Sequence, residues 1–89
     1  MSKTDQPKPV ARVGVVVRDN DNVATLLDNE TELTTLTSGL RIEAGIGFGH
    51  KVALCALAPG AEVIKYGVVI GHATTAINAG EHVHVHNVR

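Results

Sequence analysis

Short runs of alternating apolar and polar residues, separated by glycine-containing turns, dominate the sequence. Successive side chains of a strand point to opposite faces, so this period of two predicts half-buried strands. No apolar stripe with helical spacing extends beyond about two turns. The predicted strands are residues 10–18, 32–37, 40–44, 51–57, 62–66, 68–74 and 81–88.

Polar and glycine-rich segments predict how these strands are connected. Residues 19–22 are Asp-Asn-Asp-Asn, which is typical of a turn. Asp21 or Asn22 can cap free backbone N–H groups, which predicts one short helical turn over residues 23–27. Three glycines within residues 45–50 indicate a loop whose backbone is loose or closely approaches another segment.

A short internal repeat has an offset of twenty residues. Residues 56–63 align with residues 76–83, and in both an apolar pair runs into a glycine turn and then a strand opened by a polar residue. One interpretation is two similar hairpin arms folded onto each other. The other is a coincidence of turn signals. The repeat is too short for a solenoid, which needs at least three units.

Composition agrees with a mostly β domain containing at most one short helix, because 26 of 89 residues are Val, Ile or Thr. The chain is long enough for one small domain with a thin core, which favours association, including a homo-oligomer. The net charge of −1 argues against nucleic acid or an anionic membrane as a partner. Cys55, in an apolar run, is predicted to be a small buried side chain.

The sequence predicts a cytoplasmic protein. No apolar run approaches the ~20 residues of a membrane span. The first nine residues are polar and lack the apolar core of a secretory signal, and a single cysteine fits a reducing compartment. We expect residues 1–10 to be a disordered lead-in and residues 11–89 to form the domain.

Histidines are concentrated near the end of the sequence, where His82, His84 and His86 alternate with two valines. On a strand the three imidazoles share one face, and the valines face the core. Two neighbouring imidazoles can bind one metal ion, but the three together span roughly 13 Å on a straight strand. The further ligands would come from elsewhere; the candidates are Glu81, Asn87, His50 and His72. The alternative is a solvated histidine face without a ligand.

Cationic and phenolic side chains next to glycine turns are candidates for binding an anionic substrate. Lys51 follows the glycine loop, and Lys65 and Tyr66 precede Gly67. They can hold a carboxylate through charge and a hydroxyl, or they can be ordinary surface side chains.

Several segments together resemble the SAF-type β-clip domain of the altronate/galactarate dehydratase family, over about residues 12–89. The segments, in order, are Asp21-Asn-Val-Ala24, Gly49-His-Lys51, Val63-Ile-Lys-Tyr-Gly67, Ile70-Gly71 and Ala79-Gly-Glu-His-Val-His-Val-His-Asn87. The stretch between Asp28 and Gly45 matches poorly, and His72 falls on no motif of the family.

The resemblance implies a β-clip fold and a role in converting sugar acids such as altronate or galactarate to 2-keto-3-deoxy acids, with iron or manganese. A related enzyme pair eliminates sulfite from sulfolactate. Single-chain members continue into a much larger catalytic domain, so this chain is expected to be the small subunit of a split enzyme with a large catalytic subunit. The residues carried over are His50, His84 and His86 as catalytic, Lys51, Lys65, Tyr66 and Asn87 as substrate-binding, and Glu81, His82 and His84 as metal-binding.

Two other functions compete with a subunit that shares an active site. The chain can be a β-clip binding module, or a structural subunit that only shapes or caps a larger protein. The exact substrate, the metal and the division of roles among the histidines stay open.

Overall fold

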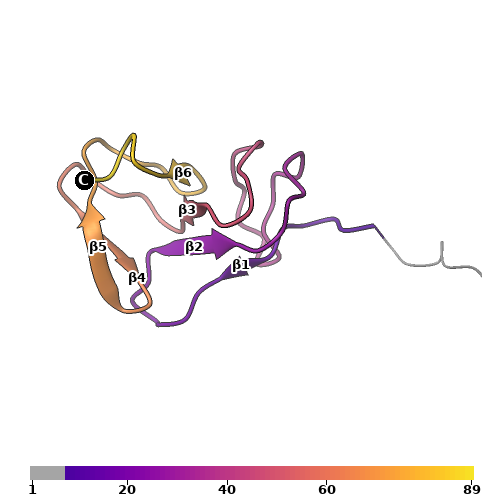
Figure 1. Cartoon of the computed structure of the whole chain (residues 1–89), viewed down its shortest axis with the longest axis horizontal. Helices are drawn as coiled ribbons and strands as arrows, with labels where there is room; N and C mark the ends of the chain where they lie inside the picture. The colour runs from indigo at the N-terminus through magenta and orange to yellow at the C-terminus, as the bar shows by residue number, and fades with distance from the viewer. Residues whose placement is uncertain (1–7) are drawn as a thin grey trace, which may run out of the picture.

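The computed structural model describes residues 8–89, and these residues form six short strands and no helix (Figure 1). The prediction of a mostly β domain is therefore confirmed. Seven residues of the expected lead-in, 1–7, lie outside the described residues. No described segment is a helix long and apolar enough to cross a membrane.

The strands form two antiparallel sheets. One has four strands in the order β1-β2-β3-β6, and the other is a two-stranded hairpin, β4-β5. The strands are β1 (Gly14–Val15), β2 (Val23–Leu26), β3 (Lys51–Ala53), β4 (Glu62–Lys65), β5 (Val68–His72) and β6 (His82–Val83). In Figure 1 the β4-β5 hairpin lies at one end of the molecule, beside the four-stranded sheet.

The short helical turn predicted at residues 23–27 is wrong, because Val23–Leu26 is strand β2. This strand pairs with β1 on one side and β3 on the other, and all four of its residues are buried. One face of β2 packs into one hydrophobic core through Val23, and the other face packs into a second core through Ala24 and Leu26. Local sequence does not reveal such a central strand, because it is buried on both faces and its pairing with β3 joins residues far apart in the chain.

Several predicted strands are much shorter in the structure. Residues 10–18 contribute only β1, and residues 51–57 only β3. The predicted pair 32–37 and 40–44 is reduced to an isolated bridge between Thr35 and Arg41. Elsewhere the backbone groups of these segments bond to loops instead of forming continuous ladders.

A hydrophobic core lies on each face of the four-stranded sheet. The first comprises Val23, Ala53, Leu57, Val63, Ala73, Ile77 and Val83. The second comprises Ala24, Leu26, Leu36, Ile42, Ile46 and Val52. Alternate residues of β2 and β3 enter alternate cores, as the period of a strand requires.

The first core is built on an approximate internal twofold repeat, which confirms two similar arms folded onto each other. Leu57 and Ile77 exchange both backbone hydrogen bonds, at 2.7 and 2.9 Å. The remaining hydrogen bonds come in equivalent pairs whose residues are twenty positions apart. The N–H of Gly60 donates to Ala73 O and the N–H of Gly80 donates to Ala53 O, both at 2.7 Å. Likewise, the N–H of Ala73 donates to Ala61 O at 2.8 Å and the N–H of Ala53 donates to Glu81 O at 2.9 Å. Val63 and Val83 are equivalent buried residues of this repeat.

Asp21 and Asn22 hold the β4-β5 hairpin against the main sheet. The Asn22 side chain donates to the carbonyl of Glu62 at 2.8 Å and accepts from the N–H of Ile64 at 2.7 Å. It therefore acts as an additional piece of strand along β4. The Asp21 carboxylate accepts from the N–H of Gly67 at 2.7 Å, at the hairpin turn. These two residues fix the position of the Lys65–Tyr66 segment.

Arg12 is a fully buried cation that organises the opposite end of the domain. Its guanidinium donates to the Asp28 carboxylate at 2.8 Å, to the Asp28 carbonyl at 2.8 Å and to the carbonyl of Ile46. Burying a charge is tolerated only when it is paired and hydrogen-bonded, as it is here. The bond to Ile46 anchors the glycine loop that leads to His50.

Candidate functional site

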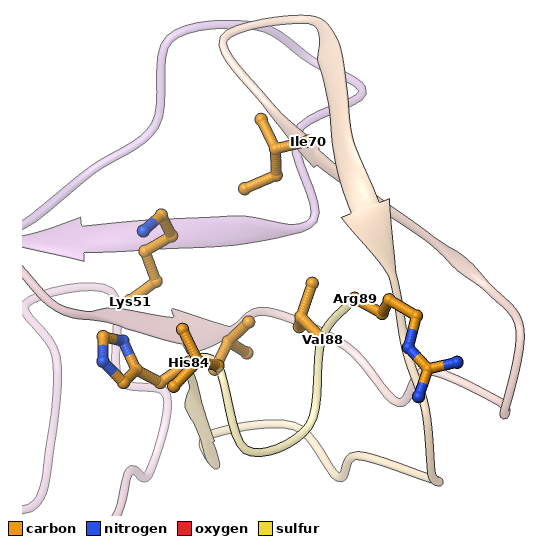
Figure 2. A pocket seen from close by; sticks show the side chains of 7 residues that line it. Lys51, Ile70, His84, Val88 and Arg89 are labelled. Atoms are coloured by element: carbon orange, nitrogen blue, oxygen red, sulfur yellow. The ribbon is translucent and has the colours of Figure 1, made fainter.

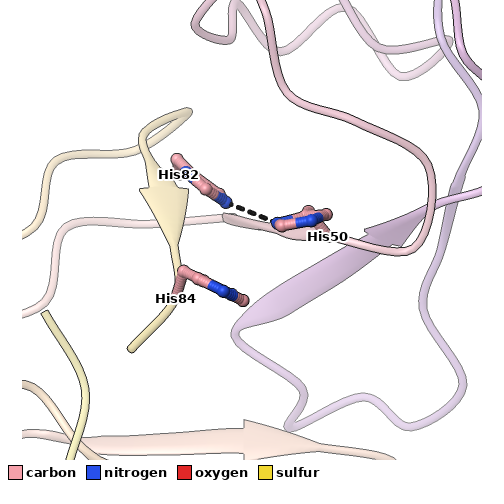
Figure 3. Close-up of side chains that lie close together, drawn as sticks. All are labelled: His50, His82 and His84. Carbon is pink, nitrogen blue, oxygen red and sulfur yellow. Dashed lines mark hydrogen bonds between the residues drawn. The ribbon is translucent and has the colours of Figure 1, made fainter. Parts of the chain in front are cut away.

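Three histidines from two segments far apart in the sequence converge on one point (Figure 3). His50 ends the glycine loop immediately before β3, His82 lies on β6, and His84 follows β6. The two rings His50 and His82 approach within hydrogen-bond distance, with 2.9 Å between Nδ1 of His50 and Nε2 of His82. One nitrogen from each of the three residues lies within 4.8 Å of the others. The pairing of β3 with β6 produces this meeting, because Val52 lies opposite His82.

The predicted strand over residues 81–88 is wrong beyond Val83. The chain turns at residues 84–87, where the Asn87 side chain donates to the His82 carbonyl at 2.8 Å and accepts from the His84 N–H at 2.9 Å. Val85, expected to face the core, is 82% exposed. Asn87 is thus a buried residue that shapes the turn, and its predicted contact with substrate stays untested.

Because of this turn, His82, His84 and His86 lie closer together than they would on the straight strand that the sequence predicts. The rings of His82 and His84 lie 5.4 Å apart and nearly parallel, and His86 lies 5.4 Å from His82. His50 lies 4.6 Å from His84. The four imidazoles therefore form a cluster in place of a line.

The three-histidine set could hold a divalent cation if the rings moved closer together. Three nitrogens bound to one ion at about 2.1 Å in tetrahedral geometry lie roughly 3.4 Å apart, whereas the three here lie within 4.8 Å of one another, so the rings would have to rotate toward one another on binding. Glu81, the predicted carboxylate ligand, is not part of this set. Its carboxylate accepts from the N–H of Asn78 at 2.7 Å, which closes the turn before β6.

The cluster favours neutral imidazole at its centre. Partial burial and the neighbouring His50, His86 and His84 lower the pKa of His82, while Glu43 acts in the opposite direction. A neutral imidazole keeps a lone pair that can accept a proton or bind a metal. Glu43 is held close to His82 because its N–H donates to the carbonyl of Gly80 at 3.0 Å.

A hollow of about 290 Å³ adjoins the cluster and shares His84 with it (Figure 2). Its lining residues are Lys51, Ile70, Val83, His84, Val85, Val88 and Arg89. No lining residue is acidic. Partial burial, and then the nearby charge of Lys65, lower the pKa of Lys51. An anion bound beside Lys51 would offset both effects, so the hollow is suited to an anionic group.

Lys65 and Tyr66 lie at the tip of the β4-β5 hairpin and do not line this hollow. The Lys65 ammonium lies 4.8 Å from the centre of the Tyr66 ring. Tyr66 has a positive φ of 57°, and Asp21 fixes the turn by accepting from the next residue, Gly67. Of the predicted substrate-binding residues, Lys51 therefore lines the hollow and the hairpin pair does not, although Lys65 lies near enough for its charge to lower the pKa of Lys51.

Two further predictions can be compared with the structure. Cys55 is exposed, so its expected burial is wrong; the chain leaves β3 after Ala53 and bends, so that Leu54 and Leu57 contact the cores while Cys55 faces outward. His72 lies apart from the histidine cluster and lines a different hollow, of about 430 Å³, together with Thr74 and Arg89.

Residue-by-residue reading of the sequence missed Glu43, Ile70 and Arg89 as neighbours of the site. Glu43 belongs to a segment that carries no recognisable motif. Ile70 and Arg89 reach the hollow only because the hairpin and the final residues fold over Lys51 (Figure 2). No local signal indicates such contacts.

Fold and site together define a small all-strand domain that presents a cluster of imidazoles beside an anion-compatible hollow. Residues 12–89 match the altronate/galactarate dehydratase SAF domain. The chain belongs to this family.

Similar proteins occur both as parts of long enzymes and as a separate subunit. The chain is 44% identical over 72 residues to the altronate dehydratase of Escherichia coli K12, covering 78% of this chain and 14% of that enzyme. It is 40% identical over 77 residues to the (2R)-sulfolactate sulfo-lyase subunit alpha of Chromohalobacter salexigens, covering 86% of this chain and 82% of that subunit. The galactarate dehydratase (L-threo-forming) of E. coli K12 is 43% identical over 68 residues, 74% of this chain and 13% of that enzyme.

Proposed function

We propose that this chain is the small subunit of a lyase that acts on a hydroxylated carboxylic acid, and that its histidine cluster contributes to an active site completed by a larger catalytic chain. The observation that carries the proposal is the convergence of His50, His82 and His84 next to the Lys51 hollow. The similarity to a separate alpha subunit over most of its length supports a multi-subunit enzyme.

The proposed reaction is a β-elimination. A base removes the proton next to the carboxylate, the group on the adjacent carbon departs, and the resulting enol becomes a 2-keto acid. Sugar acids would lose water and sulfolactate would lose sulfite, so both substrate classes fit this scheme. Negative charge develops on the carboxylate side as the proton leaves, so a nearby cation lowers the barrier. Lys51 lies where it can bind that carboxylate.

The histidines divide into two proposed groups. His50, His82 and His84 would hold a divalent cation, iron or manganese, which would supply Lewis-acid polarisation of the substrate oxygens. His86 is outside this donor set but belongs to the same cluster. With the three other imidazoles occupied, His86 is the one available to move a proton as a general base or acid.

The test is co-expression with a candidate large catalytic subunit, followed by assays of altronate and galactarate dehydration and of sulfite release from sulfolactate. We expect His86→Ala to lower kcat by about 10²–10⁴-fold while bound metal is retained. His50→Ala should lower both metal content and turnover. His72→Ala is the matched control, since His72 lies outside the cluster, and it should retain both.

The alternative of a purely structural or binding subunit makes the opposite prediction. In that case the complex would form, and His50→Ala, His84→Ala and His86→Ala would all retain full turnover. That result would overturn the proposed shared site.

A further inference from the structure

Strand β5 exposes apolar side chains that have no cover among residues 8–89. Val68, Val69 and Ile70 are 61%, 43% and 45% exposed, respectively. A strand with one face against a core normally alternates buried and exposed residues, and β5 does not. Val68 and Val69 are consecutive and point to opposite faces, so this short strand exposes apolar side chains on both of its faces. No charged residue interrupts the run, and exposed apolar surface of this kind is typical of a site of contact with another protein.

An irregularity in the hairpin directs this surface toward the candidate site. Val63 lies opposite Gly71 and Ile64 opposite Val69, so Ile70 has no opposing residue on β4. An extra residue of this kind bends a strand and re-aims its side chain. Figure 2 shows Ile70 across the hollow from Lys51.

The outer edge of β5 is also only partly used. Beyond β4, the Asn22 side chain occupies the neighbouring position. On the other side of the hairpin, His72 exchanges two backbone hydrogen bonds with Arg89, both 2.9 Å. Among the described residues, no backbone partner outside the hairpin is found for residues 68–70. This short stretch is therefore open to a neighbouring chain.

We propose that Val68, Val69, Ile70 and Val85, here called the β5 patch, form the surface on which the catalytic chain of the same lyase docks. Ile70 and Val85 belong both to the patch and to the lining of the hollow. A chain that covers the patch therefore also closes the open side of the hollow beside Lys51 and His84. The inference rests on the proposed function.

The chemistry of the partner surface follows from the patch. It presents apolar side chains to Val68 and Val69, and its outer part meets a hollow whose ionisable residues are Lys51, His84 and Arg89. Similar domains account for 14% of one enzyme and 82% of a separate alpha subunit, so related domains occur both within a longer chain and apart from one. A second copy of this chain would not bring the remaining catalytic residues to the hollow.

The binding experiment measures the Kd between this chain and a candidate large catalytic subunit. Val69→Lys and Val68→Lys should each raise the Kd at least tenfold, because a charge would be buried against an apolar surface. Val13→Lys is the matched control, since Val13 is an exposed valine adjoining β1, and it should stay within twofold. In the wild-type complex, amide exchange at residues 68–70 should slow at least tenfold.

The outcomes separate this inference from the proposed function. Unchanged exchange at residues 68–70 in an active complex, or wild-type Kd values for both lysine variants, would overturn the docking surface alone. A complex protected at these residues but unable to turn over substrate would overturn the function alone. A dimer of this chain that Val69→Lys dissociates, or the absence of any complex, would also overturn the docking proposal.

Discussion

Gly60 and Gly80 have the same backbone conformation, with φ of 85° and 86°, at equivalent turns of the internal repeat. Their surroundings differ. A Cβ at Gly80 would fall on the carbonyl group of Arg41, whereas nothing lies within 4 Å of a Cβ at Gly60. The close approach at Gly80 positions Glu43 beside His82, so this glycine is linked to the site and its counterpart is not.

The pair provides an internally controlled test of that close approach. Gly60→Ala should lower the free energy of unfolding by about 1–2 kcal/mol, which is the cost of a left-handed conformation for alanine. Gly80→Ala should cost about 2 kcal/mol more, because the backbone of Arg41 must also move. Urea unfolding of both variants measures the difference. Equal losses would contradict the packing described for Gly80.

Metal binding should depend on the three-histidine set. We expect the chain to bind Mn²⁺ or Zn²⁺, with His50→Ala and His84→Ala each weakening affinity at least tenfold, because each removes a ligand nitrogen. His86→Ala should bind within threefold of the wild type. Affinity should be lower at pH 5.5 than at pH 7.5, because protons compete with the metal for the imidazole nitrogens. Titration calorimetry at pH 7.5 and 5.5 measures both effects, and equal affinity in all variants would exclude this site.

The Arg12–Asp28 pair should govern stability in acid. Burial alone would raise the pKa of Asp28. Hydrogen bonds from the N–H of Val13, from Arg12 and from the N–H of Glu30, together with the charge of Arg12, lower it by more, so the pKa lies below 3.8. The folded state therefore favours the carboxylate. The stabilisation that the Asp28 carboxylate gives to the folded state is therefore complete above the ordinary aspartate pKa of 3.8, and it is lost as the pH falls through the lower pKa of the folded state.

Asp28→Asn should accordingly lose about 3 kcal/mol at pH 7, because the buried Arg12 keeps its charge without a charged partner. Its stability should then change less than that of the wild type between pH 5 and about 2. Glu32→Gln, which changes an exposed carboxylate, should behave like the wild type at pH 7. Thermal unfolding across this pH range is the measurement, and parallel curves for Asp28→Asn and the wild type would contradict the assignment.

Asn22 should control how firmly the β4-β5 hairpin is held. Asn22→Ala removes two hydrogen bonds to β4 and should lower the free energy of unfolding by about 2 kcal/mol. Amide exchange of Ile64 should accelerate, since Asn22 accepts its N–H. Asn20→Ala, an exposed neighbour, should stay within about 0.5 kcal/mol. If Ile64 exchanges at the wild-type rate in Asn22→Ala, the side chain does not hold the hairpin.

Local patterns predicted the parts of the fold that form between nearby residues. The hairpin formed by Glu62–Lys65 and Val68–His72 was predicted to within two residues, because a glycine turn joins two alternating runs. The arms of the repeat were also visible in the sequence. Val23–Leu26 was not identified as a strand, since all four residues are buried without the alternation of a half-buried strand, and the pairing with β3 joins residues far apart in the chain.

The candidate site was predicted in its residue types more than in its geometry. The histidines were selected because several lie close together in sequence, but a straight strand was assumed. Asn87 ends that strand through its own side chain, and pairing across thirty-two positions brings His50 to His82. Neither effect follows from the period of the sequence, because both depend on how separate segments meet.

The internal repeat has a consequence for redesign of the domain. Its halves share a core and a hydrogen-bond pattern as far as Val63 and Val83, and they differ in the four residues that follow: Ile-Lys-Tyr-Gly after one and His-Val-His-Asn after the other. The differing segments therefore extend from a common base, one carrying imidazoles and the other the Lys65–Tyr66 turn. Val85 of the β5 patch lies among the imidazoles, so a redesign of the segment after Val83 changes the chemistry of the site and the proposed docking surface together.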